Sequence, residues 1–207
     1  MVLEYWLNYV GRGLYTIDIF VKEAYKYGVN RAIPHNLLHQ LEWGTPILLA
    51  QYNRKNRSAF IFGYFIFSTI TTNLDDDTID EVLKELKVVK IKKHDNPKKS
   101  TIHRMCGSYT LSRTIELKST PREIIEKMKE KAKGKFKIFI GGKFYGLKPF
   151  TVSPIGFTRG LMKIELDKEI FFDTISPKTL LKQIKEYQQR TYLPKKSKKS
   201  FPLHLVI

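Results

Sequence analysis

The segment Ala59–Thr71 constrains the fold most, because it is a long run of aromatic and β-branched residues with little polar alternation. Such a strand needs cover on both faces, which requires further layers of structure around it. Gly63 lies inside the run, where a glycine predicts a β-bulge or a close backbone contact. We therefore expect a central, buried strand.

Helices and further strands surround this run without strict alternation. Capping residues and apolar spacing predict helices at 16–27, from Pro34 to Gly44, at 79–86, 120–133 and 176–189. Strands are expected at 47–52, 108–117, 136–140, 143–147 and 161–166. We interpret the aspartates at 75–77 as N-capping and helix-dipole residues rather than metal ligands. The order predicts an α+β fold with mixed or antiparallel sheets.

Two alternating runs joined by Gly141-Gly142 predict a tight hairpin with a primed turn. Phe139 then lies opposite Phe144, on a face that also carries Lys135 and Lys137. Paired aromatic rings flanked by lysines suit base stacking and phosphate contact. The alternative is that both faces of this hairpin are covered and the two phenylalanines belong to the core.

Charge is distributed unevenly along the chain. Residues 1–87 contain 9 lysines and arginines against 10 acids, whereas residues 88–207 contain 28 against 10. We accordingly divide the chain into a near-neutral part, 1–88, and a basic α+β part, 89–207, with one continuous domain as the alternative. Lysine and arginine that neutralise phosphates release condensed counterions and give sequence-independent affinity. A polyanionic partner is expected, nucleic acid first, with RNA or single strands preferred.

Basic clusters supply the candidate contacts to nucleic acid. The helix from Pro121 adds a row of lysines at four-residue spacing, with little acid between them. The candidates outside the hairpin are Arg54, Lys55, Arg57, Lys90, Lys92, Lys93, Lys98, Lys99, Lys127, Lys131, Lys135, Lys195, Lys196, Lys198 and Lys199. Lys90–Thr101 is expected to be a basic loop.

Two other functions remain open. Glu116 and Lys118 are spaced like the Glu-x-Lys half of a metal-dependent nuclease core, in which an acid holds Mg²⁺ and a lysine stabilises developing charge. Alternatively, the lysines bind an acidic protein partner. His35 and His39 have metal-ligand spacing, but no third ligand is evident and we interpret them as a surface pair. We prefer binding over catalysis and expect no cofactor and no metal.

Residues 15–72 resemble the opening of a PUA-like domain, the superfamily that contains the PUA and ASCH domains. The resemblance rests on Arg31-Ala32-Ile33-Pro34, the following leucine-rich helix, Trp43-Gly44-Thr45 and the strands up to Phe65. It implies a small β-barrel suited to RNA or modified-base recognition. The ASCH signature is absent around Glu42–Pro46, so no catalytic residue follows from the resemblance.

The sequence also bears on compartment. Met1–Tyr9 has no basic segment typical of a signal peptide, and the longest apolar run is too short to span a bilayer. Cys106 is the single cysteine, which excludes an intrachain disulfide and a cysteine-based zinc cluster. We expect a cytoplasmic protein with no membrane partner.

Overall fold

Helices and strands are both abundant in the computed structural model, which describes residues 3–10, 14–33, 35–38, 40–72, 74–86, 91–93, 113–115, 119–132, 137–157, 160–166, 169–170 and 173–192. The helices are α1 (Leu14–Tyr27), α2 (His35–Leu38), α3 (Asp76–Glu85), α5 (Pro121–Lys131) and α6 (Pro177–Tyr192). The strands are β1 (Leu3–Tyr9), β2 (Val29–Ala32), β3 (Pro46–Asn53), β4 (Ser58–Ile66), β5 (Thr69–Thr72), β6 (Ile91–Lys93), β7 (Arg113–Ile115), β8 (Ile138–Gly142), β9 (Phe144–Val152) and β10 (Leu161–Leu166). The predicted α+β class is confirmed.

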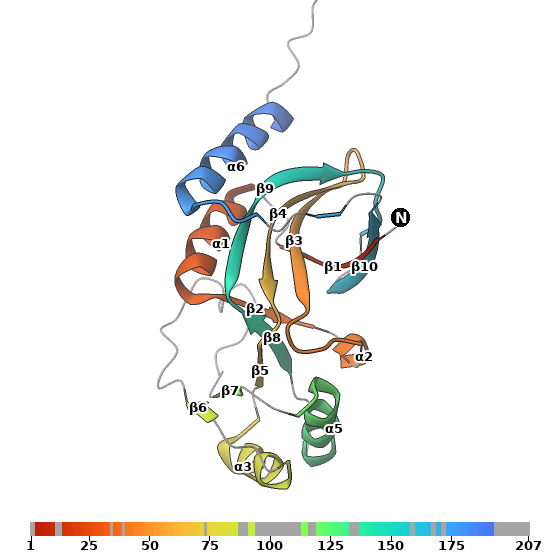
Figure 1. Ribbon diagram of the computed structural model, residues 1–207, viewed down its shortest axis with the longest axis vertical. Coiled ribbons are helices and arrows are strands. Elements are labelled where there is room, and N and C mark those ends of the chain that lie inside the picture. The colour runs from red at the N-terminus through yellow and green to blue at the C-terminus, as the bar shows by residue number, and fades with distance from the viewer. Residues whose placement is uncertain are drawn as a thin grey trace, which may run out of the picture.

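Two five-stranded sheets organise these elements (Figure 1). The first has the order β10-β1-β3-β4-β9 and is mixed, because β1 and β3 run parallel while the other neighbours are antiparallel. The second has the order β2-β8-β5-β7-β6 and is antiparallel. The β-barrel expected from the PUA-like resemblance is not formed by the described strands, since β10 and β9 at the two edges of the first sheet are not paired. Each sheet combines strands from both sides of residue 88.

The run Ala59–Thr71 forms two strands rather than one. Strand β4 belongs to the first sheet and β5 to the second, and the chain changes sheets at Phe67 and Ser68. Nearly all of β4 is buried, so the predicted cover on both faces is confirmed. The register shifts beside Gly63, where a Cβ atom would lie 2.7 Å from the Tyr145 carbonyl oxygen and 2.6 Å from the Phe144 ring. Both the predicted bulge and the predicted close contact are present.

The predicted hairpin around Gly141-Gly142 is wrong. Both glycines lie in β8, which pairs with β2 and β5 in the second sheet, whereas β9 pairs with β4 in the first. The chain crosses between sheets at Lys143, beside the point where β4 leads into β5. There the Ser68 N–H donates to the Gly141 carbonyl oxygen (2.9 Å). The glycines allow the two crossing backbones to approach, rather than forming a turn.

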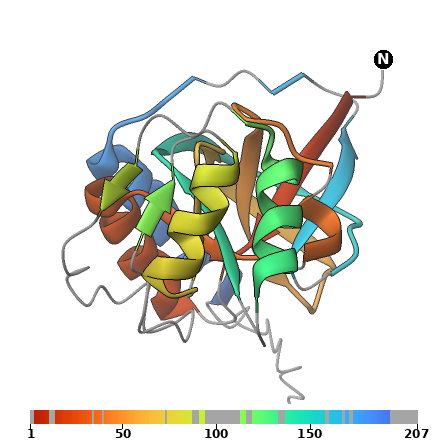
Figure 2. The ribbon, with the colours of Figure 1, turned by 90° about the horizontal axis from the view of Figure 1, so that it is seen from below.

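The four longer helices lie in two groups. In the first, α1 and α6 cover one face of the first sheet, where Phe20 packs edge-on against Phe62 and Phe144. In the second, α3 and α5 lie side by side against the second sheet (Figure 2). One continuous apolar core joins both groups. The opposite face of the first sheet has its own cluster, which Ile170 helps to cover.

Helix capping follows the sequence closely. The Asp75 carboxylate accepts from the Thr78 N–H (2.8 Å), so the predicted N-cap of α3 is confirmed. At α5, Thr120 and Glu123 form the predicted capping box, each side chain accepting from the other's backbone N–H. Helix α1 begins at Leu14, before the expected Thr16. Within the described residues, no helix has both the length and the apolar character that crossing a bilayer requires.

Candidate functional site

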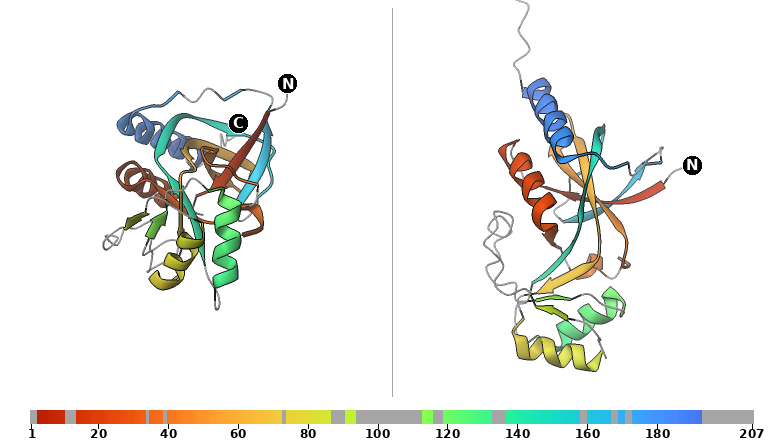
Figure 3. Two further views of the ribbon diagram at one scale, coloured as in Figure 1. Left: turned by 60° about the horizontal axis from the view of Figure 1, so that its bottom comes forward. Right: turned by 60° about the vertical axis from the view of Figure 1, so that its left-hand side comes forward.

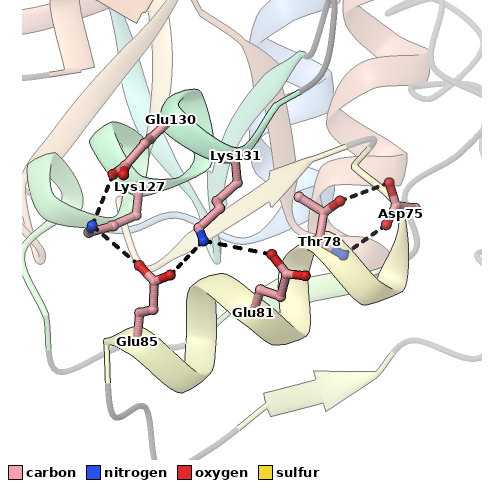
Figure 4. A network of polar contacts seen from close by, with 7 residues as sticks. All are labelled: Asp75, Thr78, Glu81, Glu85, Lys127, Glu130 and Lys131. Atoms are coloured by element: carbon pink, nitrogen blue, oxygen red, sulfur yellow. Dashed lines mark hydrogen bonds and ion pairs between the residues drawn. The ribbon is translucent and has the colours of Figure 1, made fainter.

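The lysines predicted on α5 face an acidic helix instead of open solvent (Figure 4). Lys131 pairs with Glu85 (2.7 Å) and with Glu81 (3.7 Å), both on α3. Lys127 pairs with Glu130 (2.9 Å) and with Glu85 (3.2 Å). The expectation of little acid between these lysines is therefore wrong, because Glu130 lies between them on α5 and α3 supplies Glu81 and Glu85.

These ion pairs shift the pKa values of their members toward the charged forms. Hydrogen bonds from Lys131 and Lys127 lower the pKa of Glu85. Hydrogen bonds that Lys127 donates to Glu130 and Glu85 raise the pKa of Lys127, and the one that Lys131 donates to Glu85 raises the pKa of Lys131. A phosphate that approached these lysines would have to displace carboxylates and meet the remaining acids of α3. The α3–α5 end of the molecule is a poor phosphate surface.

Helix α6 presents a different arrangement. Leu180 and Ile184 are buried against the first sheet, and the ring of Tyr187 stacks on Phe60 with 3.7 Å between ring centroids. Just before α6, the Ile175 N–H donates to the Gly146 carbonyl oxygen, and the Ile175 carbonyl oxygen accepts from the Tyr25 hydroxyl, both at 2.9 Å. The helix is thus fixed at its start and along its inner face.

The outer face of α6 carries a row of exposed lysines. Lys178, Lys182 and Lys185 follow the i, i+4, i+7 spacing and lie on the side opposite Leu180 and Ile184. Within the described part of the chain, none of the three ammonium groups pairs with a carboxylate. They span about 10 Å of helix axis, so their fields overlap at a Debye length of about 8 Å.

A second cationic feature is the turn between β3 and β4, where sequence analysis placed it. Arg54, Lys55 and Arg57 are all exposed there. The turn is held by the Asn53 side chain, which accepts from the Lys55 N–H (3.0 Å). Arg57 has a φ of 49°, an uncommon value for a residue with a Cβ atom. These contacts fix the backbone from which the three cations project.

The two features lie at the same end of the molecule. In Figures 1 and 3, α6 and the β3–β4 turn occupy the end opposite α3 and α5. Strand β9 links them: it packs against α6 and ends beside the turn, and it carries the exposed Lys148. We call this surface the cationic end, defined by Arg54, Lys55, Arg57, Lys148, Lys178, Lys182 and Lys185.

Other residues predicted to contact nucleic acid lie outside the cationic end. Phe139 and Phe144 are 1% and 3% exposed, so the expectation that they stack on bases is wrong. They belong to different sheets and both are covered. Lys137 is exposed directly before β8. Lys92 and Lys93 lie in β6, an edge strand of the second sheet, rather than in a loop.

Several predicted residues lie outside the described part of the chain. They are Lys90, Lys98, Lys99, Glu116, Lys118, Lys135, Lys195, Lys196, Lys198, Lys199 and His39. The nuclease hypothesis built on Glu116 and Lys118 therefore stays a prediction. Among the described residues, no group of three or more histidine, cysteine, aspartate or glutamate side chains could hold a metal ion.

An aromatic cluster adjoins the cationic turn. The rings of Tyr9, Tyr52 and Phe157 pack together with centroid separations of 5.1–5.4 Å. The Tyr9 hydroxyl donates to the Gly156 carbonyl oxygen (2.9 Å), which holds the loop after β9 against the sheet. Phe157 is 40% exposed, whereas Tyr9 is 7% exposed. The cluster therefore has a buried base and one accessible ring.

We predict an alkaline transition from Tyr9. Burial, helped by the nearby Tyr52, raises the pKa of Tyr9 from 10.0 to about 12. A raised pKa means stability that is complete below pH 10 and is lost as pH rises toward 12, by about 2 kcal/mol. Urea denaturation at about pH 9 and about pH 12 should show this loss in the wild type and a smaller one in Tyr9→Phe. Equal losses in both proteins would contradict the prediction.

The lysines of α6 and the exposed Phe157 were not among the residues predicted from the sequence. The α6 signal was present, because Lys178, Lys182 and Lys185 repeat with helical spacing opposite two apolar residues. Phe157 lies between Gly156 and Thr158 in a segment with no strand pattern, a setting that favours a loop over the core.

Comparison with known proteins gives no relative for this chain: no protein family, no curated protein and no solved structure matches it. The resemblance of residues 15–72 to PUA-like domains stays a prediction.

Proposed function

We propose that this protein binds nucleic acid, and that the cationic end contacts the sugar-phosphate backbone. The observation that carries the proposal is the row of Lys178, Lys182 and Lys185 on the outer face of α6. These lysines are aligned, exposed and without a carboxylate partner among the described residues. Lysines in this state can neutralise phosphates and so release the cations condensed on the nucleic acid, which is the source of backbone affinity.

The distribution of charge supports the same function. Helix α6 carries four cations and one acid, Glu186, whereas α3 carries five acids and one cation, Lys84. The net charge of α6 therefore attracts phosphate and that of α3 repels it, and this asymmetry orients the encounter. Four further lysines follow α6 in the sequence, between residues 195 and 199.

Salt dependence tests this proposal directly. Contact of the three α6 lysines with phosphates gives log K a slope of at least about −2 against log salt, which is about 20-fold in affinity between 0.05 and 0.2 M. Fluorescence anisotropy with labelled single-stranded and duplex oligonucleotides measures the slope. Absence of binding at low salt, or affinity that stays flat, would overturn the proposal. Capture of an acidic protein after nuclease treatment, without oligonucleotide binding, would favour the protein-partner alternative.

A further inference from the structure

The loop after β9 offers an aromatic ring beside the cationic turn. It is joined to the turn by two hydrogen bonds: the Ile155 N–H donates to the Arg57 carbonyl oxygen (2.9 Å), and the Ser153 hydroxyl donates to the Asn56 carbonyl oxygen (3.3 Å). The loop and the turn therefore form one local unit. Phe157 and the three cations of the turn belong to the same surface.

The Phe157 ring is supported from one side. It lies nearly parallel to Tyr9, at an interplanar angle of 26°, and at 35° to Tyr52. Both tyrosines are in turn fixed, since the Tyr9 hydroxyl donates to Gly156 and the Tyr52 hydroxyl to Ile155. A large apolar ring that is held in place and yet 40% exposed leaves part of its surface open to another flat group.

We propose that Phe157 is a stacking platform for one unpaired base of a single-stranded nucleic acid, with Arg54, Lys55 and Arg57 contacting the neighbouring phosphates. This inference rests on the proposed function and adds the class of nucleic acid. In a duplex each base is covered by its neighbours, so only a single strand can lay the face of a base on a protein ring. Stacking tolerates any base, so we expect little preference between bases.

The test compares Phe157→Leu with the wild type on three probes: a single-stranded oligonucleotide, an abasic strand of equal length, and a duplex. Leucine keeps apolar cover over Tyr9 and Tyr52 but has no aromatic face. We expect affinity for the single strand to fall about 10-fold, with affinity for the abasic strand and the duplex unchanged. Phe157→Trp should bind the single strand about as tightly as the wild type does, because it keeps an aromatic face. Stacking of a base should quench the fluorescence of the new indole. RNA and DNA versions of the strand show whether the sugar matters.

Tyr27→Leu is the matched control, because Tyr27 is an exposed aromatic residue on α1 (49%) away from the loop. It should leave all three affinities unchanged. If Phe157→Leu binds every probe like the wild type, or loses duplex and abasic binding equally, the stacking inference is overturned while the proposed function stands. If the wild type binds none of the probes at low salt, the proposed function itself fails.

Discussion

Replacing Lys178, Lys182 and Lys185 with glutamine should weaken nucleic-acid binding about 100-fold at about 0.1 M salt, because each lost phosphate contact removes about 0.7–0.9 from the salt slope. The slope of log K against log salt should accordingly become shallower by about 2. Near 1 M salt the variant and the wild type should bind alike, since counterion release then contributes little. Anisotropy titrations over this range of salt measure all three quantities. Glutamine retains helix propensity, so α6 should remain folded.

A matched control separates local contact from total charge. Lys84→Gln, Arg122→Gln and Lys129→Gln together remove the same three charges from the exposed surfaces of α3 and α5. Both triple variants lower the formal net charge from +17 to +14. We expect the control to change affinity by less than about 3-fold, because its cations lie on α3 and α5, at the end of the molecule opposite the cationic end. Equal losses in the two variants would mean that net charge alone drives binding, and would contradict the site.

Local chemistry explains which parts of the fold could be predicted from the sequence. Thr120 and Glu123 satisfy each other's backbone groups within a few residues, so the start of α5 needs no distant partner. The same holds for Asp75 at α3 and for the turn at Arg54–Arg57. The unbroken apolar character of β4 likewise reports its burial on both faces. Each of these features depends on residues that are close together in the sequence.

Strand pairing could not be predicted in the same way. Gly141-Gly142 between alternating runs has the composition of a hairpin turn, yet the same composition suits a place where two backbones cross. The difference depends on β4 and β5, which lie about seventy residues earlier in the chain and occupy the positions that a hairpin partner would take. A short-range pattern carries no information about this competition.

The candidate site likewise combines features that the local sequence predicts with features that depend on distant residues. Lysines with helical spacing occur on both α5 and α6, and the sequence does not distinguish them. Only the packed structure reveals that α3 supplies Glu81 and Glu85 to Lys131 on α5, while the outer face of α6 has no such neighbour among the described residues. The spacing of lysines along a helix can be read from the local sequence, whereas their pairing with carboxylates depends on which helix packs beside them. A search for cationic helix faces must therefore include the helices that pack beside them.

The crossing of the two chain segments gives the second large prediction. Gly142→Ala should lower the free energy of unfolding by about 3 kcal/mol or more, because the new Cβ would overlap the Ile66 carbonyl oxygen and lie 3.0 Å from the Ser68 hydroxyl oxygen. One of these atoms is backbone, so relief requires the strands themselves to move. Urea denaturation measures the change, and circular dichroism of the variant shows whether the sheets persist.

Two further substitutions decide between a crossing and a turn. A primed hairpin turn would accept Gly141→Asn with little loss, since asparagine is favoured there. At the crossing, a Cβ on Gly141 would meet the Val29 carbonyl oxygen and the Thr69 hydroxyl oxygen, so Gly141→Asn should destabilise strongly. Gly156→Ala is the control, because nothing lies within 4 Å of the added atom, and it should change stability by no more than about 0.5 kcal/mol. Wild-type stability in Gly141→Asn and Gly142→Ala would restore the hairpin and would separate β8 from the sheet in which it is placed.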